Sequence, residues 1–353
     1  MDKIQSTIRQ IGMPDYEFIK ACQKRLDNLT KPQGSLGRLE ELAKQIVGVT
    51  GKENPEFKNT VIFTFAADHG VTEEGVSAFP KEVTLQMVYN FLNQGAGINV
   101  LAKHAGARVV VADFGVAGDL KEDSRLIIRK INYGTKNMAK VPAMSRQEAI
   151  KSIEAGIEIF EDEFKKGLDI AGTGEMGIGN TTSASAIVAS ITKAEVKQVT
   201  GRGTGLDDRG LENKIRIIEK SLSVNKPDAA DPIDVLSKLG GFEIGGLTGV
   251  ILGGCARKIP VVIDGFISGA AALLAYKLEP KTKEYMIAAH CSVERGHKVI
   301  LDYIGLKPLL DLDLRLGEGT GAALAMVIVE AAVKILNEMA TFQGAQVSKG
   351  NEK

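Results

Sequence analysis

Short apolar runs alternate along the chain with longer segments in which apolar residues recur at helical spacing. Five of these runs have the length of strands and cover residues 60–66, 108–113, 168–171, 260–264 and 285–289. Helices are predicted over residues 15–28, 39–49, 81–92, 97–105, 146–166, 244–257, 267–278 and 322–339. Continuously apolar strands separated by helices indicate a parallel sheet covered by helices on both faces. The pattern therefore predicts an α/β fold.

Polar or glycine residues follow each of the five predicted strands. Asp68, Asp113, the stretch from Gly172, Asp264 and His290 stand at these five ends. In an open parallel sheet, ligands bind beyond the carboxyl ends of the strands, so these residues predict one crevice along that edge. Turn residues also end strands for purely structural reasons, which is the simpler interpretation of any single one of them.

Residues 168–182 form the most informative segment, because an apolar run ends there in a loop rich in glycine. Glycine lets backbone N–H groups approach a ligand closely. The helix predicted to start near Thr181 would offer further unpaired N–H groups to an anion. The segment therefore predicts a phosphate or nucleotide site, and Glu175 is the one carboxylate inside it.

The same glycines allow a second interpretation as a dinucleotide-binding fingerprint. Gly172, Gly174 and Gly177 match G-x-G-x-x-G and follow a predicted strand. That fingerprint also needs a strand ending in an acidic residue about 20 positions later, and residues 193–197 form a poor strand. The spacing therefore favours a mononucleotide site over a nicotinamide or flavin dinucleotide site.

A second candidate group, Glu318, lies between two glycines just before the apolar helix predicted over residues 322–339. A partly desolvated carboxylate has a raised pKa and is a better general base at neutral pH. A glutamate at a helix start also serves simply as a cap that the helix dipole stabilises. Both interpretations remain open for Glu318. Glu175 is likewise either a second acid–base group or an acceptor that orients a ligand.

Composition narrows the possible classes of protein. The 353 residues carry 44 Lys and Arg against 44 Asp and Glu, so net charge favours neither nucleic acid nor an anionic membrane. Tryptophan is absent, and Cys22, Cys255 and Cys291 are odd in number and widely spaced, as in reduced cytosolic proteins. The chain shows no signal-peptide pattern, no internal repeat and no low-complexity segment. We expect a cytoplasmic protein with a disordered tail over residues 346–353.

Metal binding and cysteine chemistry have little support. His69 and His290 both end predicted strands, but no H-x-x-x-H or C-x-x-C spacing accompanies them. The sequence therefore predicts no metal site. Cys291 as a nucleophile is equally unsupported.

Six motifs then identify a family. They are KPQGSLGRL at 31–39, ADHGV at 67–71, GVS at 75–77, EMGIGNTT at 175–182, GRGTG at 201–205 and LGEGTG at 316–321. Their order resembles that of the phosphoribosyltransferases that make the lower-ligand nucleotide of cobalamin, from about residue 10 to residue 340. The resemblance implies transfer of 5-phosphoribose from nicotinate mononucleotide to 5,6-dimethylbenzimidazole, which gives α-ribazole 5′-phosphate and nicotinate. It also implies direct displacement with inversion, with Glu318 as general base and no metal or organic cofactor.

The resemblance further implies an architecture. Such enzymes have a three-layer, Rossmann-like sheet and act as homodimers. A small helical domain would combine residues 1–30 with 305–345, and residues 31–304 would form the large α/β catalytic domain.

The resemblance also implies a set of site residues, both within these motifs and between them. Catalysis falls to Glu318 and Glu175. The phosphate of the mononucleotide would contact Gly174, Gly177, Gly179, Asn180, Thr181, Gly203 and Ser292, with Lys214 as a cationic contact. Asp264 would accept bonds from the ribose hydroxyls or, alternatively, only cap the next helix. The base pocket would contain Ser77, Phe79, Pro80, Gln86, Met87, Met176 and Leu316.

Two positions depart from the family pattern. Some members have serine before the proline and glutamine where this chain has Phe79 and Met87. A more apolar pocket would also admit other benzimidazoles or phenolic bases. Three alternatives stand beside the enzyme hypothesis: a catalytically silent nucleotide-binding protein, a subunit that needs a paralogous partner, and a dinucleotide-dependent oxidoreductase. The presence of Glu318 argues against the silent protein.

Overall fold

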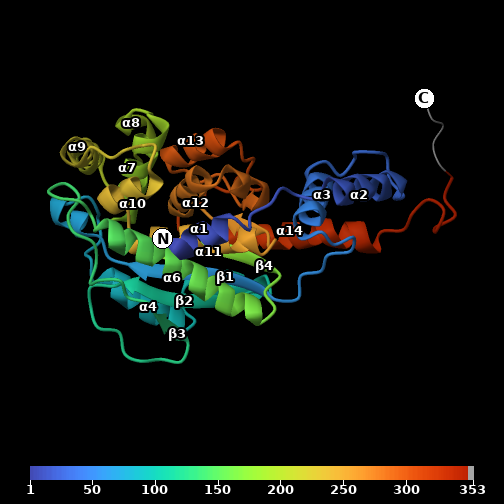
Figure 1. Ribbon diagram of the computed structural model, residues 1–353, viewed down its shortest axis with the longest axis horizontal. Helices are drawn as coiled ribbons and strands as arrows, with labels where there is room; N and C mark the ends of the chain where they lie inside the picture. The colour runs from blue at the N-terminus through green and yellow to red at the C-terminus, as the bar shows by residue number, and fades with distance from the viewer. Residues whose placement is uncertain (349–353) are drawn as a thin grey trace.

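The computed structural model describes residues 1–348 and contains a six-stranded sheet with helices on both faces (Figure 1). Across the sheet the strands are β3 (Leu126–Ile128), β2 (Arg108–Gly115), β1 (Thr60–Ala67), β4 (Ile170–Met176), β5 (Val261–Ile263) and β6 (Met286–Ala288). All neighbouring strands run parallel. The predicted α/β fold is therefore confirmed. The direction in which the chain adds strands reverses between β1 and β4.

All five predicted strands are present, but the third of them, β4, is longer than predicted. The expectation that a loop starts at Gly172 is wrong, because β4 continues to Met176 and Gly174 pairs with Thr64 of β1. A Cβ atom at Gly174 would lie 2.2 Å from the carbonyl oxygen of Glu318. The missing side chain therefore lets a C-terminal segment lie directly on the strand. The sequence does not predict the short edge strand β3, whose apolar run is only three residues long.

The helices form two layers around the sheet. One face is covered by α1 (Asp2–Ile8), α6 (Arg146–Lys165), α11 (Phe242–Ala256) and α12 (Phe266–Leu278), and the other by α3 (Arg38–Thr50), α4 (Val83–Leu92), α5 (Gly97–His104) and α14 (Thr320–Glu338). Along β1, Phe63 and Phe65 contact the first layer, whereas Ile62 and Ala66 contact the second. This alternation follows from the two-residue period of a strand and buries both faces.

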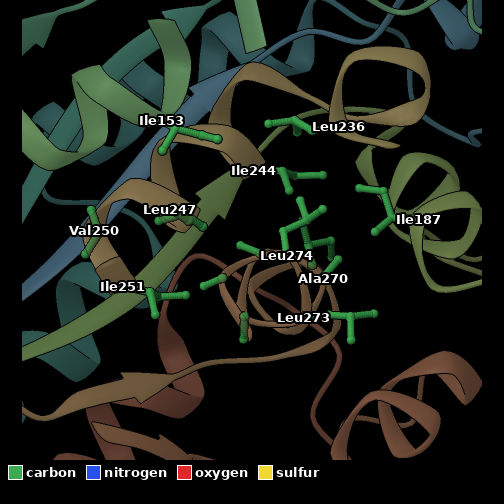
Figure 2. Packing of buried hydrophobic residues seen from close by; sticks show 14 of the residues in the cluster. Ile153, Ile187, Leu236, Ile244, Leu247, Val250, Ile251, Ala270, Leu273 and Leu274 are labelled. Carbon is green, nitrogen blue, oxygen red and sulfur yellow. The ribbon is translucent and has the colours of Figure 1, made fainter. Parts of the chain in front are cut away.

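Five further α-helices form a cap beside α12 at one end of the molecule (Figure 1). They are α7 (Asn180–Thr192), α8 (Val196–Val199), α9 (Asp208–Asn225), α10 (Pro232–Leu239) and α13 (Arg295–Ile304). Two 3₁₀ helices cover Gly70–Glu74 and Pro280–Tyr285, and α2 (Tyr16–Asn28) lies beside α3. Figure 2 shows how closely the first layer packs, with Ile153 of α6 beside Ile244 and Leu247 of α11 and with Ala270 and Leu274 of α12 next to them.

Helices α6 and α11 cross with their backbones almost in contact. A Cβ atom at Gly156 would lie 1.9 Å from the carbonyl oxygen of Gly246, and one at Gly249 would lie 2.0 Å from that of Ile153. Glycine is therefore needed here for close approach rather than for an unusual φ angle.

A separate apolar cluster joins α2, α3 and the end of α14. Its buried members are Cys22, Leu26, Leu29, Ala43, Val47 and Leu336. Helix α1 instead contacts α6 and α11. The division into domains 1–30 with 305–345 and 31–304 stays a prediction. Of the tail predicted over 346–353, residues 349–353 lie outside the described residues.

Within residues 1–348, α14 is the one helix that is long and apolar enough to cross a membrane by length and composition. It packs on β4, β5, α3 and α5. Its apolar character is therefore accounted for by its place in the core, where Ala323, Ala325 and Val329 are buried.

Candidate active site

A cavity of about 260 Å³ lies at the carboxyl ends of β4, β5 and β6. It is lined by Phe79, Glu175, Met176, Gly177, Ile178, Asn180, Thr181, Gly203, Thr204, Gly265, Phe266, Ile267, His290, Ser292, Glu294, Arg315, Leu316 and Gly317. β4 lies at the reversal of strand order, which is where open α/β sheets bind ligands. The cavity therefore lies along the predicted sheet edge, but the prediction that all five strand ends form it is wrong, because Asp68 and Asp113, at the ends of β1 and β2, do not line it.

The turn between β4 and α7 forms one wall of the cavity. Gly179 caps α7 with φ of +95°, and the helix begins at Asn180, one residue earlier than predicted. A Cβ atom at Gly177 would lie 2.3 Å from the carbonyl oxygen of Ala67, so this turn runs close against the end of β1. The start of α7 therefore faces the cavity through Asn180 and Thr181, as an anion site requires.

Glu318 lies in a strained segment directly before α14. Gly317, Glu318 and Gly319 have φ angles of +90°, +63° and +100°. A non-glycine residue in this region is unfavourable and persists only where its surroundings enforce it. Here the Thr64 hydroxyl donates to the Glu318 carbonyl oxygen at 2.9 Å, and the Glu318 N–H donates to the Glu175 carbonyl oxygen at 3.3 Å. The sheet thus fixes the backbone that carries Glu318.

The Glu318 side chain does not cap its own helix. Its Oε2 accepts a hydrogen bond of 3.0 Å from the backbone N–H of Ile98, in the first turn of α5. Burial raises the pKa of Glu318, against the opposing effect of that bond. A raised pKa suits a general base, and the contact with α5 orients the carboxylate. The expected cap of α14 is therefore absent, because the carboxylate caps the start of α5 instead. The general-base role stays a prediction.

Asp264 caps α14 instead. Its Oδ2 accepts from the Gly319 N–H at 3.1 Å and its Oδ1 from the Ala322 N–H at 3.0 Å. Burial raises the pKa of Asp264 to about 7, although these backbone bonds oppose the shift. Asp264 therefore acts as a cap, but of α14 rather than of the next helix along the chain, α12, for which the sequence predicted this alternative role. A role toward ribose stays a prediction.

Glu175 ends β4 and lines the cavity. Its Oε2 accepts from the side-chain amide of Asn180. Burial raises the pKa of Glu175 well above its usual range, and the nearby carboxylates of Asp264, Glu243 and Glu318 raise it further. Glu175 therefore favours its neutral acid form, which can donate a hydrogen bond to a ligand.

Lys214 is fully buried on α9 rather than solvated. Its Nζ donates to the Thr181 hydroxyl at 2.7 Å, and a Cβ atom at Gly203 would lie 3.0 Å from Nζ. Burial lowers its pKa to about 8. Lys214 therefore lies behind the wall formed by Thr181 and Gly203 and does not line the cavity.

The residues predicted for the site divide into two groups according to whether they line the cavity. Phe79, Glu175, Met176, Gly177, Asn180, Thr181, Gly203, Ser292 and Leu316 line the cavity, whereas Ser77, Pro80, Gln86, Met87, Gly174, Gly179, Lys214, Asp264 and Glu318 do not. Ser77 lies near it, because its hydroxyl is 3.3 Å from that of Thr204. Met87 packs in the core layer of α14.

Sequence reasoning missed six lining residues. They are Thr204, Phe266, Ile267, Glu294, Arg315 and Gly317. A signal existed for three of them. Thr204 lies in the GRGTG motif, Gly317 lies in the LGEGTG motif, and Arg315 directly precedes that motif. By contrast, no pattern marks the apolar residues at the start of α12.

His69 and His290, for which the sequence predicts no metal site, both lie near carboxylates. His69 Nε2 lies 2.6 Å from Glu243 Oε1, with both side chains buried, and His290 Nε2 lies 3.8 Å from Asp264 Oδ1. Across the described residues, no group of three or more His, Cys, Asp or Glu side chains could hold a metal ion.

The fully buried His297, on α13 next to the cavity, gives a prediction for stability. Its Nδ1 accepts from the Ser292 N–H at 3.0 Å, and burial lowers its pKa from 6.5 to about 3. The unfolded chain therefore takes up a proton that the folded chain resists, so stability present above pH 6.5 is lost as pH falls toward 3. Urea unfolding between pH 7 and pH 4 should show a shallower decline for His297→Asn. Equal slopes would contradict this account.

Known proteins resemble this chain over nearly its whole length. The phosphoribosyltransferase family profile matches residues 11–347, which include every residue that lines the cavity. The nicotinate-nucleotide–dimethylbenzimidazole phosphoribosyltransferase of Geobacter sulfurreducens is 55% identical over 99% of this chain and 100% of its own length. That of Chloroflexus aurantiacus is 57% identical over 99% of both chains. The crystal structure of CobT from Thermus thermophilus is 44% identical, with a TM-score of 0.92 over 95% of this chain and 100% of that one.

Proposed function

Because the chain belongs to the family of nicotinate-nucleotide–dimethylbenzimidazole phosphoribosyltransferases, we propose that it transfers 5-phosphoribose from nicotinate mononucleotide to 5,6-dimethylbenzimidazole or a related base. The products are α-ribazole 5′-phosphate and nicotinate, in the assembly of the cobalamin nucleotide loop. The enzyme is a pentosyltransferase. The dinucleotide-dependent oxidoreductase is set aside, since each glycine of the GxGxxG pattern has a packing role. Gly174 packs against the segment of Glu318, Gly172 against Ile62 and α14, and Gly177 against the end of β1.

One observation carries the proposal. A buried carboxylate, Glu318, is fixed in a left-handed backbone conformation next to a cavity that also receives the start of α7. An anion site on a cavity, with a proton acceptor directly beside it, supplies the two parts that a phosphorylated sugar and a base require.

The reaction follows from these parts. The imidazole nitrogen of the base attacks C1′ of the ribose, and its other ring nitrogen gives its proton to Glu318. The bond from C1′ to the pyridinium nitrogen breaks, and its electron pair returns to that nitrogen, so nicotinate leaves without protonation. Attack opposite the leaving group converts the β-nucleotide into the α-product. Direct displacement therefore needs no covalent enzyme intermediate.

Holding the two substrates in line is expected to accelerate this step at least as much as proton transfer to Glu318 does. General-base assistance is worth about 10²–10⁴ in rate, whereas holding two reactants in line reaches effective molarities of about 10⁵ M or more. Glu175 would donate from its neutral acid form toward the nicotinate or the reaction centre. Gly203, Thr181 and Ser292 would hold the phosphate.

Base preference depends on the apolar rim of the cavity. Phe79 and Leu316 are 52% and 61% exposed there, and Met176 lies beside them. A flat aromatic base would remove this apolar surface from water. Because this rim is apolar, we propose that benzimidazoles with other ring substituents, and phenols, compete with 5,6-dimethylbenzimidazole.

An assay with purified protein tests the proposal. Nicotinate mononucleotide would be incubated with 5,6-dimethylbenzimidazole, 5-methoxybenzimidazole, adenine or phenol, and the products would be separated and identified by mass spectrometry. We expect an α-ribotide with at least the benzimidazoles and release of one nicotinate for each ribotide. Absence of product with every base would overturn the function as proposed for the isolated chain.

The proposal also covers the oligomeric state and cellular location of the protein. We propose a cytoplasmic homodimer, and light scattering would measure its molar mass in solution. Activity that appears only on mixing with a paralogous chain would instead support the partner-subunit alternative.

A further inference from the structure

The cavity is lined by few ionisable side chains. Its ionisable lining residues are Glu175, His290, Glu294 and Arg315. Burial lowers the pKa of His290, so it is neutral at pH 7. Within the described part of the chain, Arg315 is therefore the one lining side chain that carries a positive charge at neutral pH. Any anionic ligand that enters must be matched mainly by this group and by backbone N–H groups.

Arg315 is exposed and largely unpaired. Its Nη1 donates to the carbonyl oxygen of Gly203 at 3.2 Å, and within residues 1–348 no carboxylate lies within ion-pair distance of it. Arg202 nearby is different, because its guanidinium pairs with Asp208 and also donates to the carbonyl oxygen of Leu206. A guanidinium has five N–H donors, so Arg315 keeps most of them for a ligand.

The position of Arg315 identifies which end of the cavity it serves. Its guanidinium reaches Gly203, where Thr181 lines the wall and Lys214 lies behind. Glu318 instead points to the start of α5, the end at which the base would be deprotonated. A second cavity, of about 340 Å³, continues beyond Gly203 and is also lined by Arg315. The guanidinium therefore lies at the phosphate end.

We propose that Arg315 binds the 5′-phosphate of the mononucleotide donor and supplies the charged contact that sequence reasoning assigned to Lys214. This inference rests on the proposed function. Glu294 lines the same end and accepts from the Gly203 N–H at 2.9 Å. A guanidinium matches phosphate with two parallel hydrogen bonds, which a lysine behind the wall cannot do.

Binding measurements on Arg315→Gln test the assignment. Calorimetry would compare nicotinate mononucleotide, ribose 5-phosphate and nicotinate riboside, which lacks the phosphate. Charge-assisted bonds of this kind predict an affinity loss of about 10-fold or more for the two phosphorylated ligands, and no change for the riboside. Arg315→Lys should recover part of the loss. Arg295→Gln is the matched control, because Arg295 lines the second cavity but not the first. This variant should bind all three ligands with the affinities of the unmodified protein.

Each outcome decides between hypotheses. Equal losses for the mononucleotide and the riboside would overturn the phosphate assignment and place Arg315 at the nicotinate carboxylate. Unchanged binding in Arg315→Gln would also overturn it. If the unmodified protein binds ribose 5-phosphate through Arg315 but forms no ribotide, the phosphate site stands and the proposed transferase function fails.

Discussion

Glu318→Gln is expected to lower kcat by about 10²–10⁴-fold and to leave the fold intact. The amide oxygen of glutamine can still accept from the Ile98 N–H, so the contact with α5 survives while the proton acceptor is lost. The rate of the unmodified enzyme should rise with pH through the pKa of Glu318, which burial places above 4.5. The variant should lack that rise. Single-turnover rates from pH 4 to pH 8 measure both effects.

Glu330→Gln is the matched control, because it makes the same chemical change on α14 at a residue that pairs only with Lys334. Its kcat should equal that of the unmodified enzyme. If Glu318→Gln raised KM for the base and kept kcat, Glu318 would be a binding residue and the base role would be wrong.

Gly249→Ala is expected to lower the free energy of unfolding strongly. Its methyl group would lie 2.0 Å from the carbonyl oxygen of Ile153, and backbone atoms of two packed helices cannot move aside as a side chain can. Overpacking of this kind costs about 1–3 kcal/mol or more, which exceeds the gain of about 1 kcal/mol from replacing glycine with alanine within a helix. Urea unfolding measures the difference.

Two further variants sharpen this test. Gly12→Ala adds a methyl group with nothing within 4 Å, so it should not lower the free energy of unfolding. Gly156→Ala enlarges the same α6–α11 contact from the other side. Once one alanine has separated the helices, the second costs less, so the double variant should lose less than the sum of the two. A Gly249→Ala protein as stable as the original would show that these helices can separate freely.

Much of the fold can be predicted from local patterns of apolar and polar residues in the sequence. Apolar runs longer than four residues mark β1 and β2, because a strand buried on both faces needs continuous apolar side chains. β4 is harder to predict, since Gly172 and Gly174 look like loop residues when considered alone. Gly174 is needed for the close approach of Glu318 and Gly319, and Gly172 for that of Ala322 and Met326 in α14, all of which are distant in sequence. Local propensity cannot indicate such a contact.

The site shows the same limit. The LGEGTG motif indicates the importance of Glu318, but its left-handed conformation depends on Thr64 and Glu175, which belong to other elements. Composition likewise cannot show that Lys214 is buried or that Asp264 is fully occupied as a cap. Burial and pairing of a charged side chain are properties of the assembled chain.

The bond between Thr64 and Glu318 also has a consequence for the order of folding. The two residues are 254 positions apart, so during synthesis the central strand exists long before its partner leaves the ribosome. Contacts of such separation form slowly, because a long loop must close before they contribute any stability. The carboxylate reaches its place only when α14 docks on β4. Catalytic competence is therefore expected to arise as the last event of folding, after the sheet and its first helical layer are complete.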